Sequence, residues 1–284
     1  PFLYIPHPKN QSEGLVRMGI IDVRNATFSY GRENVFENID LEINAGEVFC
    51  LFGPNGCGKS TLILCMLGVL PLSNGQISLG NRNVRGMKPS EVAKVAAYIP
   101  QSHEKPFPYK AIDVVLMGRT AHTATFSPPS PADRKIAEEA LEKVGIAEFR
   151  DRPYTQLSGE ETQLVLVARA LAQQTPILIM DEPTAHLDFR NELNFLETIV
   201  NLVKDSGLTI IMATHFPNHA FYFEGTGVQS GLALMNNRNI SVKGNPLEVL
   251  TEENMEHVFN IKSKIISYTW KNETLRQIVP LETF

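Results

Sequence analysis

The chain has 284 residues, which is enough for one large domain or two modest ones with a sizeable hydrophobic core. Hydrophobic residues make up 43% and charged residues 20%, a balance that excludes a globally disordered chain or a collagen-like repeat. The 26 basic and 31 acidic side chains give a net charge of −5, so no surplus of basic residues is available for general nucleic-acid binding. We therefore expect no nucleic-acid partner.

The chain carries signs of a reducing compartment and none of membrane insertion. Its three cysteines, Cys50, Cys57 and Cys65, are sparse, odd in number and set in apolar surroundings, which favours the cytosol over a secreted disulfide framework. No apolar stretch reaches the roughly 18 residues of a membrane helix, and the best candidate, 164–180, is interrupted by polar residues and a proline. We expect residues 1–18 to be an appended or extension segment, because they lack a signal-peptide layout.

The N-terminal part predicts a β-rich region that leads into a strand and a helix. Residues 25–31, 39–43 and 48–52 are strand-like and are separated by Gly and Asn turns. The last of these runs is apolar at every position, as expected of a central strand that is covered on both faces. Residues 60–70 then have the pattern of a helix.

The remainder predicts an inserted helical region and a return to the sheet. Between 87 and 152, proline-rich joints bracket helical text such as 132–144. Two further apolar runs, 177–180 and 209–213, resume the sheet on either side of a helical stretch at 191–203, and a polar helical segment covers 246–259. The expected divisions are 1–18 as extension, 19–86 as β subdomain and start of the core, 87–155 as helical subdomain, 156–230 as the remaining core, and 231–284 as a C-terminal strand and helix segment.

A phosphate-binding loop lies between the apolar strand and the helix. The sequence from Gly53 to Thr61 fits G-x-x-x-x-G-K-[ST], in which glycines let backbone N–H groups converge on phosphate oxygens beside a helix N-terminus. Lys59 would reach the β- and γ-phosphates, and Ser60 could bind Mg²⁺. An ordinary glycine turn is the alternative, which the flanking strand and helix disfavour. The expected nucleotide-binding residues are Gly53, Pro54, Asn55, Gly56, Cys57, Gly58, Lys59, Ser60 and Thr61.

With this loop, the order of elements predicts an α/β protein with the P-loop NTPase fold. The fold class is a mainly parallel sheet with helices on both faces, an N-terminal antiparallel β subdomain and an inserted helical subdomain. The expected cofactors are ATP and Mg²⁺, and the expected activity is ATP hydrolysis.

Two adjacent carboxylates end the apolar run that begins at Ile177. Because open α/β sheets place ligands at the carboxyl ends of their strands, Asp181 would hold Mg²⁺, directly or through water, and Glu182 would polarise the attacking water. A solvated acidic strand end is the alternative. The upstream phosphate loop disfavours it.

Two more polar residues follow predicted strands. His215 comes after the run 209–213, where a neutral imidazole could hydrogen-bond the γ-phosphate or the attacking water, although a lone histidine is more often structural. Gln101 follows the apolar text 97–100, and its amide could touch Mg²⁺ or water. Taken alone, that glutamine is as consistent with a structural role.

Over about residues 20–260, this order of motifs resembles the nucleotide-binding subunit of ABC transporters. Tyr30 matches the adenine-stacking aromatic of that family, Gln101 its Q-loop, the run from Leu157 through Ser158 to Gly159 the start of its signature, Ala185 to Asp188 its D-loop, and His215 its switch histidine. The resemblance implies a head-to-tail dimer, with each ATP between one phosphate loop and the other subunit's signature. It adds Tyr30, Gln101, Ser158, Gly159, Glu160 and Asp188 to the expected nucleotide-binding residues.

The signature segment has a physical basis and one departure from the family pattern. Ser158 with Glu161 forms a capping box, and a free helix N-terminus is an anion site, although a plain surface helix cap is the alternative. Glu160 stands where the family has a second glycine. At an effective dielectric constant near 20, two like charges about 4 Å apart repel by about 4 kcal/mol, so either Glu160 points away or dimer closure is weakened. We hypothesise slower basal turnover. A second departure, Phe216 followed by Pro217, affects the turn after His215.

Three functional classes remain open at this point. A single motif set without sustained heptads favours a transporter motor over a soluble ABC-type ATPase that acts on a macromolecule, and a P-loop kinase would share only the phosphate loop. Residues 184–188 and 113–119 resemble importers of iron-siderophore, haem, cobalamin and oxyanion substrates. The resemblance implies a second ATP-binding subunit, permease subunits that dock near 109–119 and Gln101, an indirect extracytoplasmic substrate-binding protein, and a peripheral place on the cytoplasmic face of the membrane.

Overall fold

The computed structural model describes residues 19–101, 107–123, 127–271 and 273–284. Residues 1–18, which we expected to be an extension, and Pro106, one of the expected proline joints, lie outside the described residues. Within the described part, no helix combines the length and the apolar character that crossing a bilayer requires.

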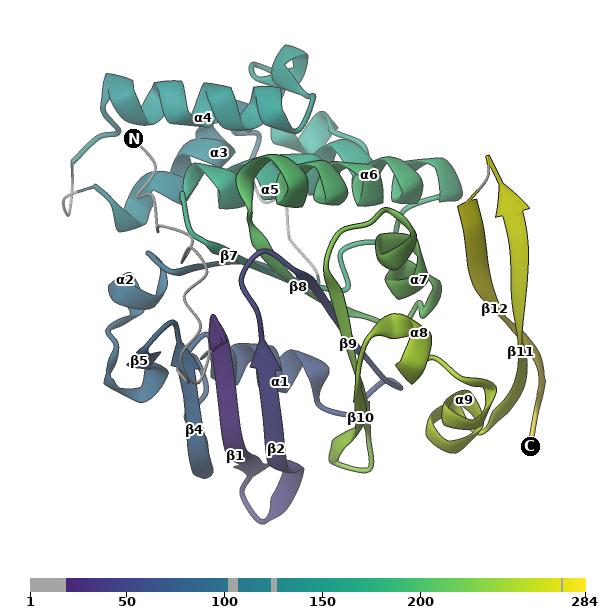
Figure 1. Cartoon of the computed structure of the whole chain (residues 1–284). Coiled ribbons are helices and arrows are strands. Elements are labelled where there is room, and N and C mark those ends of the chain that lie inside the picture. The colour runs from purple at the N-terminus through teal and green to yellow at the C-terminus, as the bar shows by residue number, and fades with distance from the viewer. Residues whose placement is uncertain (1–18, 102–106, 124–126, 272) are drawn as a thin grey trace, which may run out of the picture.

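A six-stranded sheet forms the centre of the molecule, in the order β10-β9-β3-β8-β7-β6 (Figure 1). Its strands β6, β7, β8, β3 and β9 run parallel, and β10 pairs antiparallel at the edge. The strand bounds are β3 Val48–Phe52, β6 Ala96–Ile99, β7 Ile177–Asp181, β8 Thr209–Thr214, β9 Ser230–Asn236 and β10 Asn239–Gly244.

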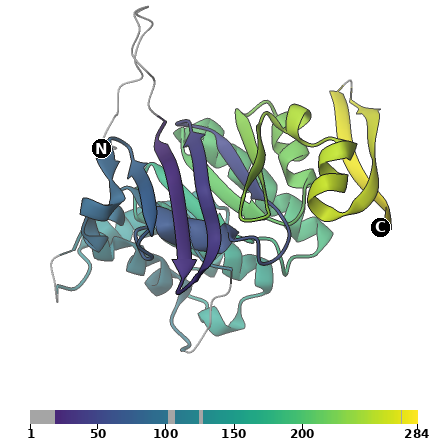
Figure 2. The same cartoon turned by 90° about the horizontal axis from the view of Figure 1, so that it is seen from below.

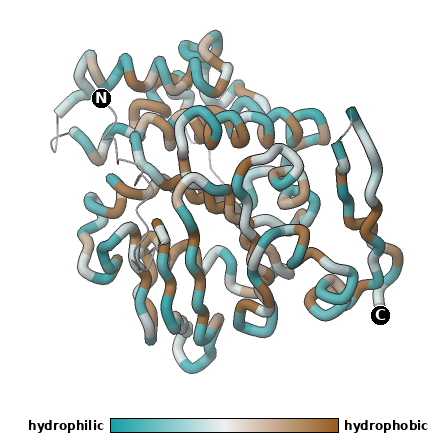
Figure 3. Tube along the Cα trace, viewed as in Figure 1, coloured by the Kyte–Doolittle hydropathy of each residue, from teal (hydrophilic) through white to brown (hydrophobic). Residues whose placement is uncertain are grey.

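The two faces of this sheet enter two different hydrophobic cores. Along β3, Val48, Cys50 and Phe52 enter the core on one face, while Phe49 and Leu51 enter the core on the other. Because successive side chains of a strand point to opposite faces, a strand covered on both sides must be apolar at every position. Figure 3 shows this apolar centre as hydrophobic segments surrounded by more hydrophilic elements.

An antiparallel sheet and a short helix cover one face. The sheet has the order β2-β1-β4-β5, and the helix α1 lies between it and the central sheet (Figures 1 and 2). The bounds are β1 Ile21–Tyr30, β2 Glu33–Ile43, α1 Lys59–Met66, β4 Asn74–Leu79, β5 Arg82–Asn83 and α2 Pro89–Val92. The predicted helix 60–70 ends early, at Met66, because Gly68 adopts the left-handed conformation, with φ of 67°.

A helical layer covers the other face. Its elements are α3 Ala111–Leu116, the 3₁₀ turn Met117–Ala121, α4 Pro131–Lys143, α5 Gly159–Ala172 and α6 Phe189–Ser206. Helix α4 begins at a Ser130 cap with proline in its first turn, and a buried Arg119–Asp133 ion pair ties it to the 3₁₀ turn. The segment 87–155 also contributes β6 to the central sheet, next to β7. The division of the chain into subdomains stays a prediction.

The C-terminal segment combines short helices with a hairpin at one side of the molecule (Figure 2). Its elements are α7 Asn218–Gly225, α8 Pro246–Val249, α9 Glu252–Phe259, β11 Ile261–Trp270 and β12 Glu273–Thr283. The hairpin β11-β12 forms a sheet of its own and is attached to α7 through Asn218, whose side chain accepts from the Ile278 N–H at 2.8 Å. At the end of α9, the Phe259 ring stacks on Phe52 at the end of β3, with centroids 4.7 Å apart.

Candidate nucleotide-binding and hydrolysis site

The phosphate loop leaves β3 through a glycine that its surroundings require. A Cβ atom on Gly53 would lie 2.3 Å from the Met235 carbonyl oxygen at the end of β9, so no larger residue fits without moving a neighbouring strand. The loop then enters α1 through Gly58, whose φ of 104° is strained for any residue with a side chain. Lys59, Ser60 and Thr61 therefore occupy the first turn of α1, where backbone N–H groups are free to bind an anion.

Lys59 is folded onto the loop. Its Nζ donates hydrogen bonds to the carbonyl oxygens of Gly53 at 2.8 Å and Pro54 at 3.1 Å, and the residue is 6% exposed. Both partners are uncharged carbonyl oxygens. A phosphate oxygen would be a stronger partner for it than either carbonyl.

Asp181 ends β7 as a buried carboxylate with an unused oxygen. The residue is 4% exposed, and its Oδ1 has no hydrogen-bond partner among the described residues. Burial raises the pKa of Asp181, and a hydrogen bond from the Ser60 side chain opposes that shift. Two oxygen donors of this kind suit Mg²⁺, which commonly binds through one or two protein ligands and the phosphates of its substrate. No cluster of three or more His, Cys, Asp or Glu side chains suited to a metal occurs in the described part of the chain.

Glu182 follows β7 and contacts residues at or just after the ends of β6 and β8. Its backbone has φ of 47°, a conformation that residues with side chains rarely adopt, and its N–H donates to the Ala213 carbonyl of β8 at 2.9 Å. Its Oε2 accepts a hydrogen bond from Gln101 Nε2 at 3.0 Å, and His215 Nδ1 lies 3.2 Å from the same oxygen. The strained backbone thus directs one carboxylate towards the ends of β6 and β8.

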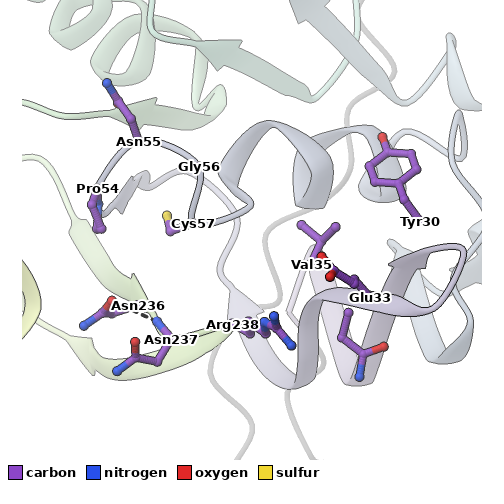
Figure 4. Close-up of a pocket in the computed structure, with 11 residues that line it drawn as sticks. Tyr30, Glu33, Val35, Pro54, Asn55, Gly56, Cys57, Asn236, Asn237 and Arg238 are labelled. Carbon is purple, nitrogen blue, oxygen red and sulfur yellow. Dashed lines mark hydrogen bonds between the residues drawn. The ribbon is translucent and has the colours of Figure 1, made fainter.

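A cavity of about 540 Å³ opens beside the first half of the phosphate loop (Figure 4). Tyr30, a residue that is 60% exposed, lines it, and its ring packs edge-on against Phe28 at a centroid distance of 4.8 Å. The turn between β9 and β10 lines the opposite wall, as Figure 4 shows for Asn237 and Arg238. The lining residues are Tyr30, Glu33, Asn34, Val35, Pro54, Asn55, Gly56, Cys57, Asn236, Asn237 and Arg238.

The segment that starts α5 lies next to the segment that starts α6. The Ser158 side chain accepts from the Glu161 N–H at 3.2 Å, and Glu161 accepts from the Ser158 N–H at 2.8 Å, which completes the predicted capping box. A Cβ atom on Gly159 would lie 3.8 Å from the His186 carbonyl oxygen. Asp188 caps α6 by accepting from the Asn191 N–H at 2.9 Å.

The structure gives Glu160 a partner. Its Oε1 accepts a hydrogen bond from Asn194 Nδ2 on α6 at 3.2 Å. Of the two alternatives that the sequence left open, a Glu160 side chain that points away or a weakened closure of the dimer, this contact favours the first.

Comparison with known proteins agrees with this geometry. Residues 36–185 match the ABC transporter family. The chain belongs to that family. The "Iron(3+)-hydroxamate import ATP-binding protein FhuC" of Bacillus subtilis is 33% identical over 250 residues, which cover 88% of this chain and 91% of the relative. The "Molybdate import ATP-binding protein MolC" of Haemophilus influenzae is 31% identical over 262 residues, which cover 92% and 96%.

A solved structure of an ABC transporter of the metal-chelate type, in an inward-facing conformation, superimposes with a TM-score of 0.81. It is 30% identical in sequence and covers 92% of this chain and 97% of its own. The predicted resemblance, the predicted fold class and the predicted class of activity, an ATPase, are confirmed by these matches. Individual site residues stay predictions.

Within this ABC transporter subunit, the contacts unite the predicted residues in two groups. The first contains the phosphate loop with Asp181, Glu182, Gln101 and His215, joined by the contacts given above. The second contains Ser158, Gly159, Glu160 and Asp188 at the starts of α5 and α6. Tyr30 shares a cavity with the phosphate loop.

Sequence reasoning overlooked contacts that join distant parts of the chain. Asn194, the partner of Glu160, has no motif around it, and the cavity wall at Asn236 to Arg238 is an ordinary hairpin turn in sequence. The local sequence of that turn does not show which loop it faces. The structure also buries Arg119, at 6% exposure, within the stretch 109–119 that we expected to dock a permease.

Proposed function

We propose that this chain is the ATP-hydrolysing motor subunit of an ABC importer, with Glu182 as the residue that activates water. The observation that carries the proposal is the convergence of Gln101 and His215 on Glu182 Oε2, at 3.0 Å and 3.2 Å, beside a phosphate loop. A carboxylate at that place can accept a proton from water. Gln101 and His215 can orient the same water or the γ-phosphate.

The remaining residues divide the work of holding the nucleotide. Ser60 and Asp181 would hold Mg²⁺, which neutralises charge on the β- and γ-phosphates when it is bound. Lys59 would exchange its two carbonyl partners for phosphate oxygens. Tyr30 presents an exposed ring on which a base can stack.

Two chains would close head to tail around two nucleotides. The capped start of α5 at Ser158, with its free backbone N–H groups, is an anion site that one chain can offer to the nucleotide of the other. ATP would stabilise the closed dimer and hydrolysis would reopen it, because the contacts between the γ-phosphate and the other chain's α5 start exist only in the closed state.

The transported substrate would be a metal chelate, most simply an iron-siderophore complex, with haem and cobalamin as related candidates. Support comes from the hydroxamate importer subunit and the metal-chelate type transporter, while the molybdate importer subunit keeps an oxyanion as a second candidate. Family membership disfavours the P-loop kinase, and the similarity to import subunits disfavours the soluble ATPase that acts on a macromolecule. The substrate-binding protein would act outside the membrane, without touching this chain.

Exposed apolar side chains at both ends of α3 would dock the permease. Phe107, Tyr109 and Met117 are 57%, 48% and 46% exposed, and the first two rings lie 5.7 Å apart. Exposed apolar patches mark protein contacts. The chain would then sit peripherally on the cytoplasmic face of the membrane. When the chain is co-expressed with its permease, wild type should sediment with membranes, and Tyr109→Asp combined with Met117→Asp should remain in the supernatant.

The experiment that tests the motor function measures ATP hydrolysis against protein concentration in the presence of Mg²⁺. The rate per chain should rise with concentration, because only the dimer completes the site. Glu182→Gln should lower the turnover number by at least about 100-fold, the size of effect expected when a catalytic base is removed.

Two controls make this result specific. Glu139→Gln changes an exposed carboxylate on α4 that lies 3.9 Å from Lys135, and it should hydrolyse ATP like wild type. Thermal unfolding of Glu182→Gln with and without Mg²⁺-ATP should still show stabilisation by the nucleotide, because binding does not need the base. Equal rates for Glu182→Gln and wild type would refute the assignment of Glu182.

A further inference from the structure

The turn that carries His215 is held by a buried threonine at the end of β8. Thr214 is 3% exposed, and its Oγ1 accepts a hydrogen bond from the Phe216 N–H at 3.0 Å. This bond spans His215 and fixes the backbone on both sides of it. The same oxygen lies 3.1 Å from Nδ1 of His219, on the first turn of α7.

His219 is a second histidine that the proposed hydrolysis does not use. It is 3% exposed, and its Nε2 contacts Glu192 Oε1 on the first turn of α6. The Glu192 N–H in turn donates to the carbonyl oxygen of Asp188, at the start of that helix, at 2.8 Å. A chain of polar contacts therefore runs from the start of α6, through a buried imidazole, to the turn that bears His215.

A neutral His219 imidazole gives every group in this series of polar contacts a hydrogen-bond partner. With its proton on Nε2, His219 donates to the Glu192 carboxylate, and its Nδ1 accepts the Thr214 hydroxyl proton while Thr214 Oγ1 accepts from Phe216. A carboxylate that fixes the tautomer of an imidazole also fixes the orientation of its ring. Because buried polar groups without partners are costly, the network favours one arrangement of the turn.

We propose that Glu192, His219 and Thr214 are positioning residues that set where the His215 ring lies relative to Glu182. The inference rests on the proposed function, because His215 Nδ1 lies 3.2 Å from Glu182 Oε2 in the site described above. The network also connects the start of α6, where Asp188 caps the helix, to the turn that bears His215 within one chain. The network should therefore affect the turnover number while leaving the affinity for Mg²⁺-ATP unchanged.

The two threonines at the ends of β8 provide a matched test. Thr209, at 0% exposure, accepts from the Gly46 N–H at 2.9 Å, as Thr214 accepts from Phe216 at 3.0 Å. Replacing either by valine removes a buried hydroxyl and keeps its shape, so both variants should lose stability. Only Thr214→Val should lower the turnover number, by about tenfold, because a small misplacement of a reacting group costs up to about 100-fold.

Serine at position 214 is the rescue variant, because it keeps the hydroxyl. We expect Thr214→Ser to have a turnover number within about twofold of wild type, and both 214 variants to keep KM for Mg²⁺-ATP within about twofold. Glu192→Ala is a second variant in case Thr214→Val fails to fold, because its side chain is 22% exposed and water can replace it. It should lower the turnover number in the same direction, by about threefold.

A measurement without turnover separates this inference from the proposed function. In histidine-selective NMR spectra of the full chain, the His215 ring signals, assigned with His215→Ala, should shift in Thr214→Val and stay unchanged in Thr209→Val. Equal turnover numbers for the two valine variants, with unshifted His215 signals, would overturn the positioning role. If Glu182→Gln hydrolyses ATP like wild type, the proposed function fails, whatever these signals show.

Discussion

Two aspartates of this chain are almost equally buried, yet their surroundings differ in kind. Asp133, at 8% exposure, accepts hydrogen bonds from the Ser130 hydroxyl at 2.6 Å and from Arg119 at 2.8 Å, and these contacts lower its pKa to about 2. Asp181, at 4% exposure, keeps one oxygen without a partner among the described residues, and its burial raises its pKa. The first site is complete in the protein alone, whereas the second keeps an oxygen for the cation that we propose it binds.

The hydrogen-bond partners of a buried charged group distinguish a structural site from a candidate binding site. Arg119 also donates to the Ala172 carbonyl at 2.7 Å and to Gln174 at 3.0 Å, so the whole cluster around Asp133 is satisfied and holds helices together. The group around Asp181 leaves hydrogen-bonding capacity unused, so we expect it to lower the stability of the nucleotide-free protein. Substitutions in the two places should therefore have opposite effects on stability.

The largest effect on stability is expected in the cluster around Asp133. Arg119→Met should lower the free energy of unfolding by about 3–5 kcal/mol, because it leaves Asp133 buried without its cation. Urea denaturation of the nucleotide-free chain measures this. Arg134→Met, which removes an exposed partner 3.4 Å from Glu138 on α4, is the matched control and should change stability by less than about 1 kcal/mol. Similar losses in both variants would show that the Arg119 cluster is not a stabilising element.

At Asp181, we expect a substitution to raise the free energy of unfolding instead of lowering it. Asp181→Asn should raise the free energy of unfolding of the nucleotide-free chain by about 0.5–2 kcal/mol, because it removes a buried charge that lacks a full set of partners. The same variant should lose the thermal stabilisation that Mg²⁺-ATP gives to wild type. Asp133→Asn should instead destabilise the chain and keep the nucleotide effect. A destabilised Asp181→Asn would contradict the comparison.

Asp133 and Asp181 should also affect the pH dependence of stability in opposite directions. The pKa of Asp133 is lowered, chiefly by the Ser130 hydrogen bond and then by Arg119, so its contribution is present above the ordinary value of 3.8 and is lost as pH falls towards about 2. The pKa of Asp181 is raised, so wild type gains stability relative to its neutral pH value as pH falls and that carboxylate takes up a proton. In urea denaturation between about pH 7 and pH 2, the free energies of unfolding of the two variants should approach that of wild type, Asp133→Asn from below and Asp181→Asn from above. Curves that stay parallel would contradict both assignments.

The sequence predicts the elements that carry local signals and misses those that depend on distant contacts. β3, β7 and β8 could be predicted because strands covered on both faces must be apolar throughout, and Asp181 and Glu182 follow β7 directly. The left-handed φ of Glu182 and the burial of Asp133 depend on packing, which no local pattern encodes. The partners of His219 and Glu160 lie on α6, a helix whose sequence shows only its amphipathic repeat.

The smallest expected effect concerns Glu160, where the contact with Asn194 revises the size of the repulsion that the sequence suggests. If Asn194 holds the carboxylate about 10 Å from a partner's phosphate, the repulsion in water is about 0.4 kcal/mol, compared with about 4 kcal/mol at 4 Å in a less polar site. Glu160→Gly should therefore raise basal turnover by about twofold, where direct contact would give about a thousandfold.

Replacing Asn194 tests whether its hydrogen bond keeps Glu160 away from the phosphates. Asn194→Ala releases Glu160 and should slow hydrolysis, because the free carboxylate can approach the phosphates, whereas the double variant with Glu160→Gly should hydrolyse ATP as fast as Glu160→Gly alone. Steady-state hydrolysis at a protein concentration that supports the dimer measures all four rates. If Glu160→Gly is no faster than wild type, the charge at this position does not limit turnover. In that case the hypothesis that Glu160 slows basal turnover is wrong.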